Sequence, residues 1–163
     1  MEIHIVLHEP EIPQNTGSIG RTCMAIGARL HLIRPLGFSL QDRYLKRAGL
    51  DYWHDLDVQI HDNWDAFKTA YPEALLWFFT TKAPRRHDQA AFSDRVFMVF
   101  GKETAGIPDS LLKEAPDQCL RIPLVKEARS LNLSVAVGVA AFEALRQSGF
   151  AGLRESDPEG RLF

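Results

Sequence analysis

The turn at residues 101–108, GKETAGIP, places an acidic side chain among glycines. It follows the apolar run Val96 to Phe100, and a glycine-rich turn after a buried strand often binds a phosphate group. Glu103 would repel a phosphate, and it stands where the dinucleotide-binding fingerprint needs its middle glycine. The turn therefore favours a neutral or cationic ligand, or a structural role for Glu103. In the structural role, its carboxylate would cap a short helix near Pro108 or accept hydrogen bonds from neighbouring backbone amides.

Basic side chains gather in two clusters that could contact a nucleic-acid backbone. The first cluster is Arg43, Lys46 and Arg47, and the second is Lys82, Arg85 and Arg86. A run of charge is usually a solvated surface, but both clusters flank turns where we expect a ligand, which favours phosphate contacts. Arg21 stands apart from both clusters. It lies beside Gly17 and Gly20, which would let a second chain or a ligand approach closely.

The sequence contains neither a metal-binding motif nor a hydrolase motif. The six histidines, at positions 4, 8, 31, 54, 61 and 87, lack the spacings of zinc motifs, and each is better explained as a solvated or core histidine. A G-x-S-x-G nucleophile elbow does not occur. The two cysteines, Cys23 and Cys119, lie in apolar contexts and are typical of buried free thiols. We therefore expect no metal.

Composition narrows the class of protein. The 163 residues fit one domain, which we place at residues 1–150, with a mobile tail at 151–163. The net charge of -2 excludes a uniformly basic nucleic-acid binder but allows a local basic patch. No apolar run approaches the ~20 residues of a membrane span. The N-terminus lacks the basic region of a signal peptide, so we expect a cytoplasmic protein.

Alternating strands and helices must position these residues. Segments with the length of buried strands occur at residues 3–7, 30–33, 75–79, 96–100 and 120–122. Residues 16–27 are typical of a helix that Asn15 or Thr16 would cap, and Trp64, Phe67 and Tyr71 fall on one face of another helix. This alternation predicts an α/β domain with a mostly parallel sheet flanked by helices.

The last predicted helix is the most apolar segment of the chain. Ser130 can cap its start, and Gly149 can end it in the left-handed conformation. It is apolar nearly all round from Leu133 to Phe142, so we expect it to be heavily buried, in a core or against a second subunit. Ligands of open α/β sheets bind at the carboxyl ends of the strands. That rule selects the turns at residues 8–17, 80–87, 101–108 and 123–132.

Three segments in order resemble the motifs of the SPOUT RNA 2′-O-ribose methyltransferases. They are PEIPQNTGSIGRT at 10–22, GKETAGIP at 101–108, and RIPLVKEARSLNLSVAVGVAAFE at 121–143. Further segments, EPEIPQNTGSIGRTC, PLGF and RAGLDYW, are similar to the small tRNA enzymes of this superfamily that modify the wobble nucleotide. The resemblance runs from Ile3 to about Gly149, nearly the whole chain.

The resemblance implies a fold, a methyl donor and an assembly. The C-terminal segment would be threaded through a loop as a deep trefoil knot, and the protein would be a homodimer. S-adenosylmethionine would be the donor, and the anticodon loop of tRNA the substrate. Carried over by position, the donor pocket would include Phe79, Thr80, Gly101, Ile122, Ser130 and Leu131.

The same resemblance places Arg21 at the acceptor ribose, supported by Asn15, Asn132 and Glu103. Arginine stays protonated in proteins, so we expect Arg21 to hold the phosphate beside the target ribose rather than act as a base. The alternatives are the same chemistry at another RNA position, or a knotted RNA-binding factor without turnover. Whether Glu103 touches the ligand or only shapes its loop stays open at this point.

Overall fold

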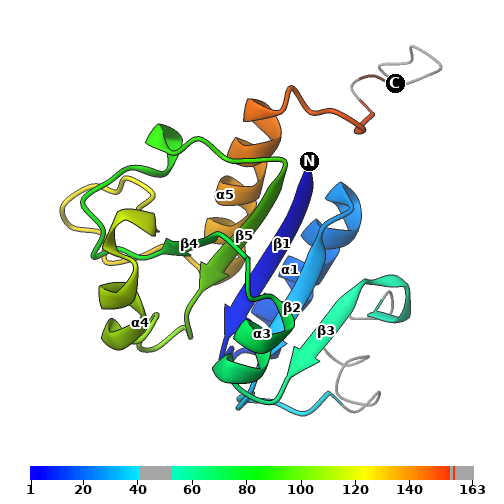
Figure 1. Ribbon diagram of the computed structural model, residues 1–163, viewed down its shortest axis with the longest axis vertical. Coiled ribbons are helices and arrows are strands. Elements are labelled where there is room, and N and C mark those ends of the chain that lie inside the picture. The colour runs from blue at the N-terminus through cyan, green and yellow to red at the C-terminus, as the bar shows by residue number, and fades with distance from the viewer. Residues whose placement is uncertain (41–52, 155, 157–163) are drawn as a thin grey trace.

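The computed structural model describes residues 1–40, 53–154 and 156 of the chain. Within them, the chain forms a sheet of six parallel strands in the order β3-β2-β1-β5-β4-β6 (Figure 1). The strands are β1 (Glu2–His8), β2 (Arg29–Ile33), β3 (Val58–His61), β4 (Leu76–Phe79), β5 (Arg95–Phe100) and β6 (Cys119–Leu120). Every strand pair is parallel, which confirms the predicted α/β class.

Helices cover both faces of the sheet (Figure 1). On one face, α1 (Pro13–Ile26) and α5 (Leu133–Gln147) pack against Ile3, Ile5 and Leu7 of β1. On the other face, α3 (Trp64–Ala70) and α4 (Asp109–Glu114) pack around Val6 and Phe97. Short 3-10 turns occur at η1 (Trp53–Asp55), η2 (His87–Gln89) and η3 (Pro116–Gln118). The central strands are therefore buried on both sides, which explains their continuous apolar runs.

A hydrogen-bonded row of histidines crosses the sheet on the α3 side. His4 Nδ1 lies 2.8 Å from His31 Nε2, and His31 Nδ1 lies 3.1 Å from His61 Nε2. His4 Nε2 lies 2.9 Å from Glu2 Oε1. A carboxylate only accepts, so each ring in the row donates through Nε2, and His4 and His31 accept through Nδ1. All three rings are buried, as core histidines.

Two helix boundaries differ from the prediction. Helix α1 begins at Pro13, not at residue 16, so Asn15 and Thr16 lie inside the helix, where both are buried, and do not cap it. Proline suits the first helical position because its missing N–H has no partner there in any helix. Helix α5 is capped by Asn132 and not by Ser130, because the Asn132 side chain accepts a hydrogen bond from the backbone of Ser134.

The burial predicted for the last helix holds for one face only. Val137, Ala140 and Ala144 are buried, but Val135, Val139 and Phe142 are 50%, 38% and 49% exposed. These three residues follow helical spacing, so they form one apolar stripe on the surface of α5, called here the α5 stripe. Gly149 follows the helix with φ +65°, which confirms the predicted left-handed ending.

Strand β3 was absent from the sequence prediction. It has four residues at the edge of the sheet, and its one isoleucine, Ile60, is 43% exposed, so it lacks the apolar run of a buried strand. At the other end of the chain, Leu153 packs against the core, while residues 155 and 157–163 of the expected tail lie outside the described residues. Among the described helices, none has both the length and the apolar character that a membrane crossing requires.

Candidate functional site

A pocket of about 540 Å³ opens at the carboxyl ends of β4 and β5, beside the start of α5. This is the edge of the sheet that the strand-end rule selects. All six residues predicted to hold a methyl donor line it: Phe79, Thr80, Gly101, Ile122, Ser130 and Leu131. The supporting residues Asn15, Glu103 and Asn132 line it as well. Residues from four separate segments of the chain therefore meet around one cavity.

One wall of the pocket is apolar and flat. The rings of Phe79 and Phe100, from neighbouring strands, stack with centroids 4.9 Å apart and planes inclined by 17°. The aliphatic side chains of Ile122, Leu131 and Leu133 also line the pocket. A surface of this kind suits a planar, weakly polar group such as a nucleobase, because aromatic and aliphatic side chains can pack against the faces of its ring.

Gly101 is held where no side chain fits. A Cβ built on it would lie 2.0 Å from the backbone carbon of Gly106 and 2.2 Å from the backbone nitrogen of Ile107. Gly106 itself has φ +69°, in the left-handed region that favours glycine. The two glycines thus allow the loop after β5 to fold back on itself and to form the floor of the pocket.

Glu103 joins the loop after β5 to the start of α1. Its Oε2 accepts from the Glu11 N–H at 2.8 Å, and its Oε1 accepts from the Ile12 N–H at 3.2 Å and from Asn15 Nδ2 at 2.9 Å. The first N–H groups of a helix have no partner within it, and α1 has no side-chain cap of its own. Glu103 supplies acceptors for the N-cap residue Ile12 and for the residue before it, and it places an anion at the positive end of the helix. Of the expected structural roles, capping near Pro108 is wrong, since α4 has no side-chain cap, and acceptance from backbone amides is confirmed.

A chain of amide hydrogen bonds continues from Glu103 to α5. Asn132 Nδ2 donates to Asn15 Oδ1 at 2.9 Å, and Asn132 Oδ1 accepts from Ser134 N at 2.9 Å and from Ser134 Oγ at 2.7 Å. Because the carboxylate can only accept, the orientation of both amides follows from it. The three ordered motifs therefore meet through this network on one side of the pocket.

Cations at the pocket are mostly paired. Lys102 Nζ lies 2.7 Å from Glu9, and this hydrogen bond raises the pKa of Lys102. Lys82 Nζ lies 2.5 Å from Asp109, and the bond lowers the pKa of Asp109. Each pair has a net charge near zero, so these lysines do not make the pocket an anion site. Sequence reasoning assigned no role to Lys102, although its place in the GKETAGIP turn could have suggested one.

The residues predicted to contact RNA lie in different segments of the chain. Arg85 and Arg86 lie in the segment after β4, where Arg86 forms an ion pair with Asp88. The first basic cluster, at residues 43, 46 and 47, lies outside the described residues. Arg21 is exposed on α1 and is not among the residues that line the pocket of its own chain.

The described residues give no indication of thiol or metal chemistry. Cys23 and Cys119 are free and buried, as predicted. Burial raises the pKa of the Cys23 thiol to about 12, so it stays protonated and is a poor nucleophile. Among the described residues, no group of three or more His, Cys, Asp or Glu side chains could hold a metal ion.

Comparison with known proteins gives consistent matches over nearly the whole chain. Residues 2–142 match the SpoU rRNA methylase family. The chain is 46% identical to the tRNA (cytidine(34)-2′-O)-methyltransferase of Escherichia coli K12, over 92% of this chain and 96% of the other.

Solved structures are similar as well. One, on the 2-OH methylation of C/U34 on tRNA, has a TM-score of 0.85 and 46% identity, and covers 91% of this chain and 97% of its own. Another, an AdoMet-bound rRNA methyltransferase from Sinorhizobium meliloti, has a TM-score of 0.79 and 27% identity, and covers 89% of this chain and 56% of its own.

Proposed function

The chain belongs to the SpoU rRNA methylase family, and from this membership we propose that it methylates the ribose 2′-hydroxyl of the wobble nucleotide, position 34, of tRNA. The methyl donor is S-adenosylmethionine. The observation that carries the proposal is the pocket, because every residue assigned to the donor by position lines that one cavity. Both cytidine and modified uridine at position 34 are proposed acceptors, in line with the related structure on C/U34.

The pocket residues fit S-adenosylmethionine in size and chemistry. A volume of about 540 Å³ is in the range of small-molecule sites. The Phe79–Phe100 wall with Leu131 would hold the adenine, and the backbone around Thr80 and Ile122 offers polar groups for its edges. Lys82 and Lys102 are each paired with a carboxylate, so the charge of these two lysines does not oppose a sulfonium.

The residues of this chain act mainly by positioning. S-adenosylmethionine, when bound, supplies a methyl group on a positively charged sulfur. Glu103, Asn15 and Asn132 hold the pocket loops in register through the hydrogen-bond network described above. Arg21 holds the phosphate beside the target ribose and thereby lines up the 2′-hydroxyl. Because its guanidinium stays protonated, this is orientation and not base catalysis, an effect that can lower a barrier by up to ~7–11 kcal/mol.

A homodimer with a knotted C-terminus completes the proposal. The α5 stripe is the kind of exposed apolar surface that a second copy would cover. Arg21 lies outside the pocket of its own chain, so a dimer would bring Arg21 of one copy to the pocket of the other. The trefoil knot is supported by the family resemblance and by the convergence of residues 79–82, 100–107 and 122–136 on one cavity.

Incubation of the purified protein with methyl-labelled donor and total tRNA, followed by mapping of the labelled nucleotide, tests the function. We expect label on the ribose of nucleotide 34. Label at another site would support methylation of a different RNA position. Calorimetry with S-adenosylmethionine separates the enzyme from a non-catalytic RNA-binding factor, which has no need of the donor. Arg21→Lys should lose turnover, and full turnover with normal RNA affinity would rule out the proposed role of Arg21.

A further inference from the structure

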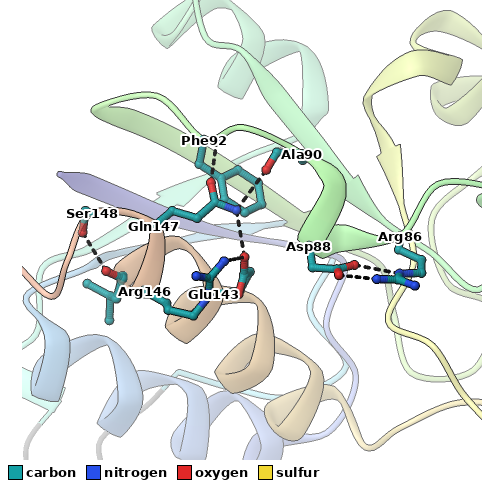
Figure 2. Close-up of polar contacts among 9 residues, drawn as sticks. Arg86, Asp88, Ala90, Phe92, Glu143, Arg146, Gln147 and Ser148 are labelled. Carbon is teal, nitrogen blue, oxygen red and sulfur yellow. Dashed lines mark hydrogen bonds and ion pairs between the residues drawn. The ribbon is translucent and has the colours of Figure 1, made fainter.

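A glutamine near the end of α5 holds the segment between β4 and β5 (Figure 2). Gln147 Nε2 donates to the Ala90 carbonyl at 2.9 Å, and Gln147 Oε1 accepts from the Phe92 N–H at 3.0 Å. Its second Nε2 hydrogen goes to Glu143 Oε1 at 2.8 Å. Both donor hydrogens are thus used, and the orientation of the amide is defined.

The same segment is held from its other side by the residue after β6. Arg121 N donates to the Arg85 carbonyl at 2.9 Å, and His87 N donates to the Arg121 carbonyl at 2.9 Å. Residues 85–92 are therefore fixed near both ends, by α5 at one end and by the sheet edge at the other.

The guanidinium of Arg85 contacts two residues that adjoin those held by Gln147. Its Nη2 donates to the Gln89 carbonyl at 2.6 Å, one residue before Ala90. Its central carbon lies 5.5 Å from the centroid of the buried Trp77 indole. Phe92 packs against the same indole edge-on, with centroids 5.8 Å apart. Gln147 therefore holds Ala90, the residue next to Gln89, and Phe92, which packs on Trp77, so each support of Arg85 is one step from a residue that Gln147 bonds.

Charge distinguishes Arg85 from the other cations of its cluster. Lys82 is paired with Asp109, and Arg86 makes two hydrogen bonds to Asp88. Within the part of the chain that the structure describes, Arg85 makes no ion pair with a carboxylate. Of the three residues of this second basic cluster, Arg85 is therefore the one whose charge no carboxylate compensates, and its remaining N–H groups can donate to a phosphate.

We propose that Arg85 is the RNA phosphate contact of this segment and that Gln147 is the residue that positions it. The proposal rests on the proposed function, since a tRNA substrate supplies the phosphate. Stacking on Trp77 and the bond to Gln89 hold the guanidinium in one orientation before RNA arrives, so less side-chain entropy is lost on binding. Gln147 acts on RNA affinity without touching RNA.

Steady-state methylation of tRNA and direct tRNA binding test the two roles. Arg85→Ala should raise the KM and the Kd for tRNA about tenfold, and lower the salt dependence of binding by about one released ion. Gln147→Met, which keeps the length of the side chain, should raise both about fivefold and leave kcat and donor affinity unchanged. Ser148→Ala is the matched control, because its hydroxyl donates only to the Leu145 carbonyl within α5 and should change nothing.

A double-mutant cycle separates positioning from a general loss of stability. If Gln147 acts through Arg85, adding Gln147→Met to Arg85→Ala should raise the Kd for tRNA by less than twofold more. Multiplication of the two single effects would overturn the proposal, as would an unchanged Kd in Gln147→Met. Hydrogen exchange of the amides in residues 85–92 should accelerate in Gln147→Met and not in Ser148→Ala.

Failure of this proposal can be told from failure of the proposed function. If the wild-type protein binds tRNA but transfers no methyl group, the proposed function fails, while the binding cycle still decides the roles of Arg85 and Gln147. If methylation at nucleotide 34 is normal in Arg85→Ala, with unchanged KM and salt dependence, the function stands and the contact at Arg85 is wrong.

Discussion

At the scale of single residues, Glu103 explains why an acid occupies a glycine-rich turn. Its three donors come from Glu11, Ile12 and Asn15, about 90 positions earlier in the chain. The carboxylate therefore faces the start of a helix and joins two of the loops that form the pocket. The turn resembles a phosphate site because it needs the same backbone freedom, but its acid has a structural task.

Replacement of this carboxylate by an amide should destabilise the protein. In Glu103→Gln one oxygen becomes an NH2 group that faces other donors, so at least one hydrogen bond to the former carboxylate is lost. We expect the free energy of unfolding to fall by about 1–3 kcal/mol in urea denaturation. Glu114→Gln, at an exposed position on α4, is the control and should have no effect. Equal stability of wild type and Glu103→Gln would contradict the structural role.

Gly101 offers a second residue-level prediction. Gly101→Ala would place a methyl group about 2 Å from the backbone of Gly106 and Ile107, so the loop must move. We expect donor binding, measured by calorimetry, to weaken at least about tenfold, since a displacement of this size alters the floor of the pocket. Gly138→Ala, on α5, is the matched control, because a methyl group added there would have no neighbouring atom within 4 Å. Normal donor affinity in Gly101→Ala would show that this loop does not form the site.

At the scale of elements, the histidine row across β1, β2 and β3 makes the stability of the folded protein depend on pH. Burial, with the neighbouring His4 and His61, lowers the pKa of His31 to about 3, and burial also lowers the pKa of His4 and of His61. The unfolded chain, with an ordinary histidine pKa near 6.5, therefore binds more protons than the folded protein below that pH. Stability is then full above about pH 6.5 and falls as the pH decreases toward 3.

The expected result is a loss of stability between pH 7 and pH 5, a window in which most carboxylates stay ionised. Urea denaturation across this window should show a steeper decline for wild type than for His31→Leu, which removes the most strongly shifted group. The absolute stability of His31→Leu should be lower at pH 7, because His4 and His61 lose a partner. Identical pH slopes for the two proteins would contradict a buried neutral row.

Elements with strong local signals were predictable from the sequence, and those that depend on distant partners were not. The apolar runs of β1 and β5, and the face of α3 with Trp64 and Phe67, follow from periodicity alone. Strand β3 has no such run. The start of α1 was placed three residues late, although Pro13 is a local signal for a first helical position, and the carboxylate that accepts from the Ile12 N–H just before it, Glu103, lies about 90 residues away.

The sequence predicted which residues line the candidate site, but not which of them contact one another. Family motifs placed the residues that line the pocket, and strand ends placed their loops. Only the folded structure shows that Lys102 pairs with Glu9. It alone also shows that Glu103, Asn15 and Asn132 follow one another in a hydrogen-bond network. Sequence spacing cannot show them, because each joins segments about 90 or more residues apart.

At the scale of the whole molecule, the α5 stripe predicts association of two copies. Sedimentation velocity should show a dimer for wild type and a monomer for Phe142→Lys, because a charge within an apolar interface would lie buried and unpaired. Leu75→Lys, at an equally exposed apolar position before β4, should remain dimeric. A monomeric wild-type protein would contradict the assembly and, with it, the supply of Arg21 from a second copy.

A crystal structure of the protein grown with S-adenosylmethionine tests the central claim most directly. We expect the donor in the pocket, against Phe79 and Leu131 and above the Gly101 turn, with Arg21 of one of the two copies within reach of a ribose placed at the methyl group. Density for the donor elsewhere, an empty pocket, or an Arg21 too distant in both copies for a ribose to bridge would contradict the account.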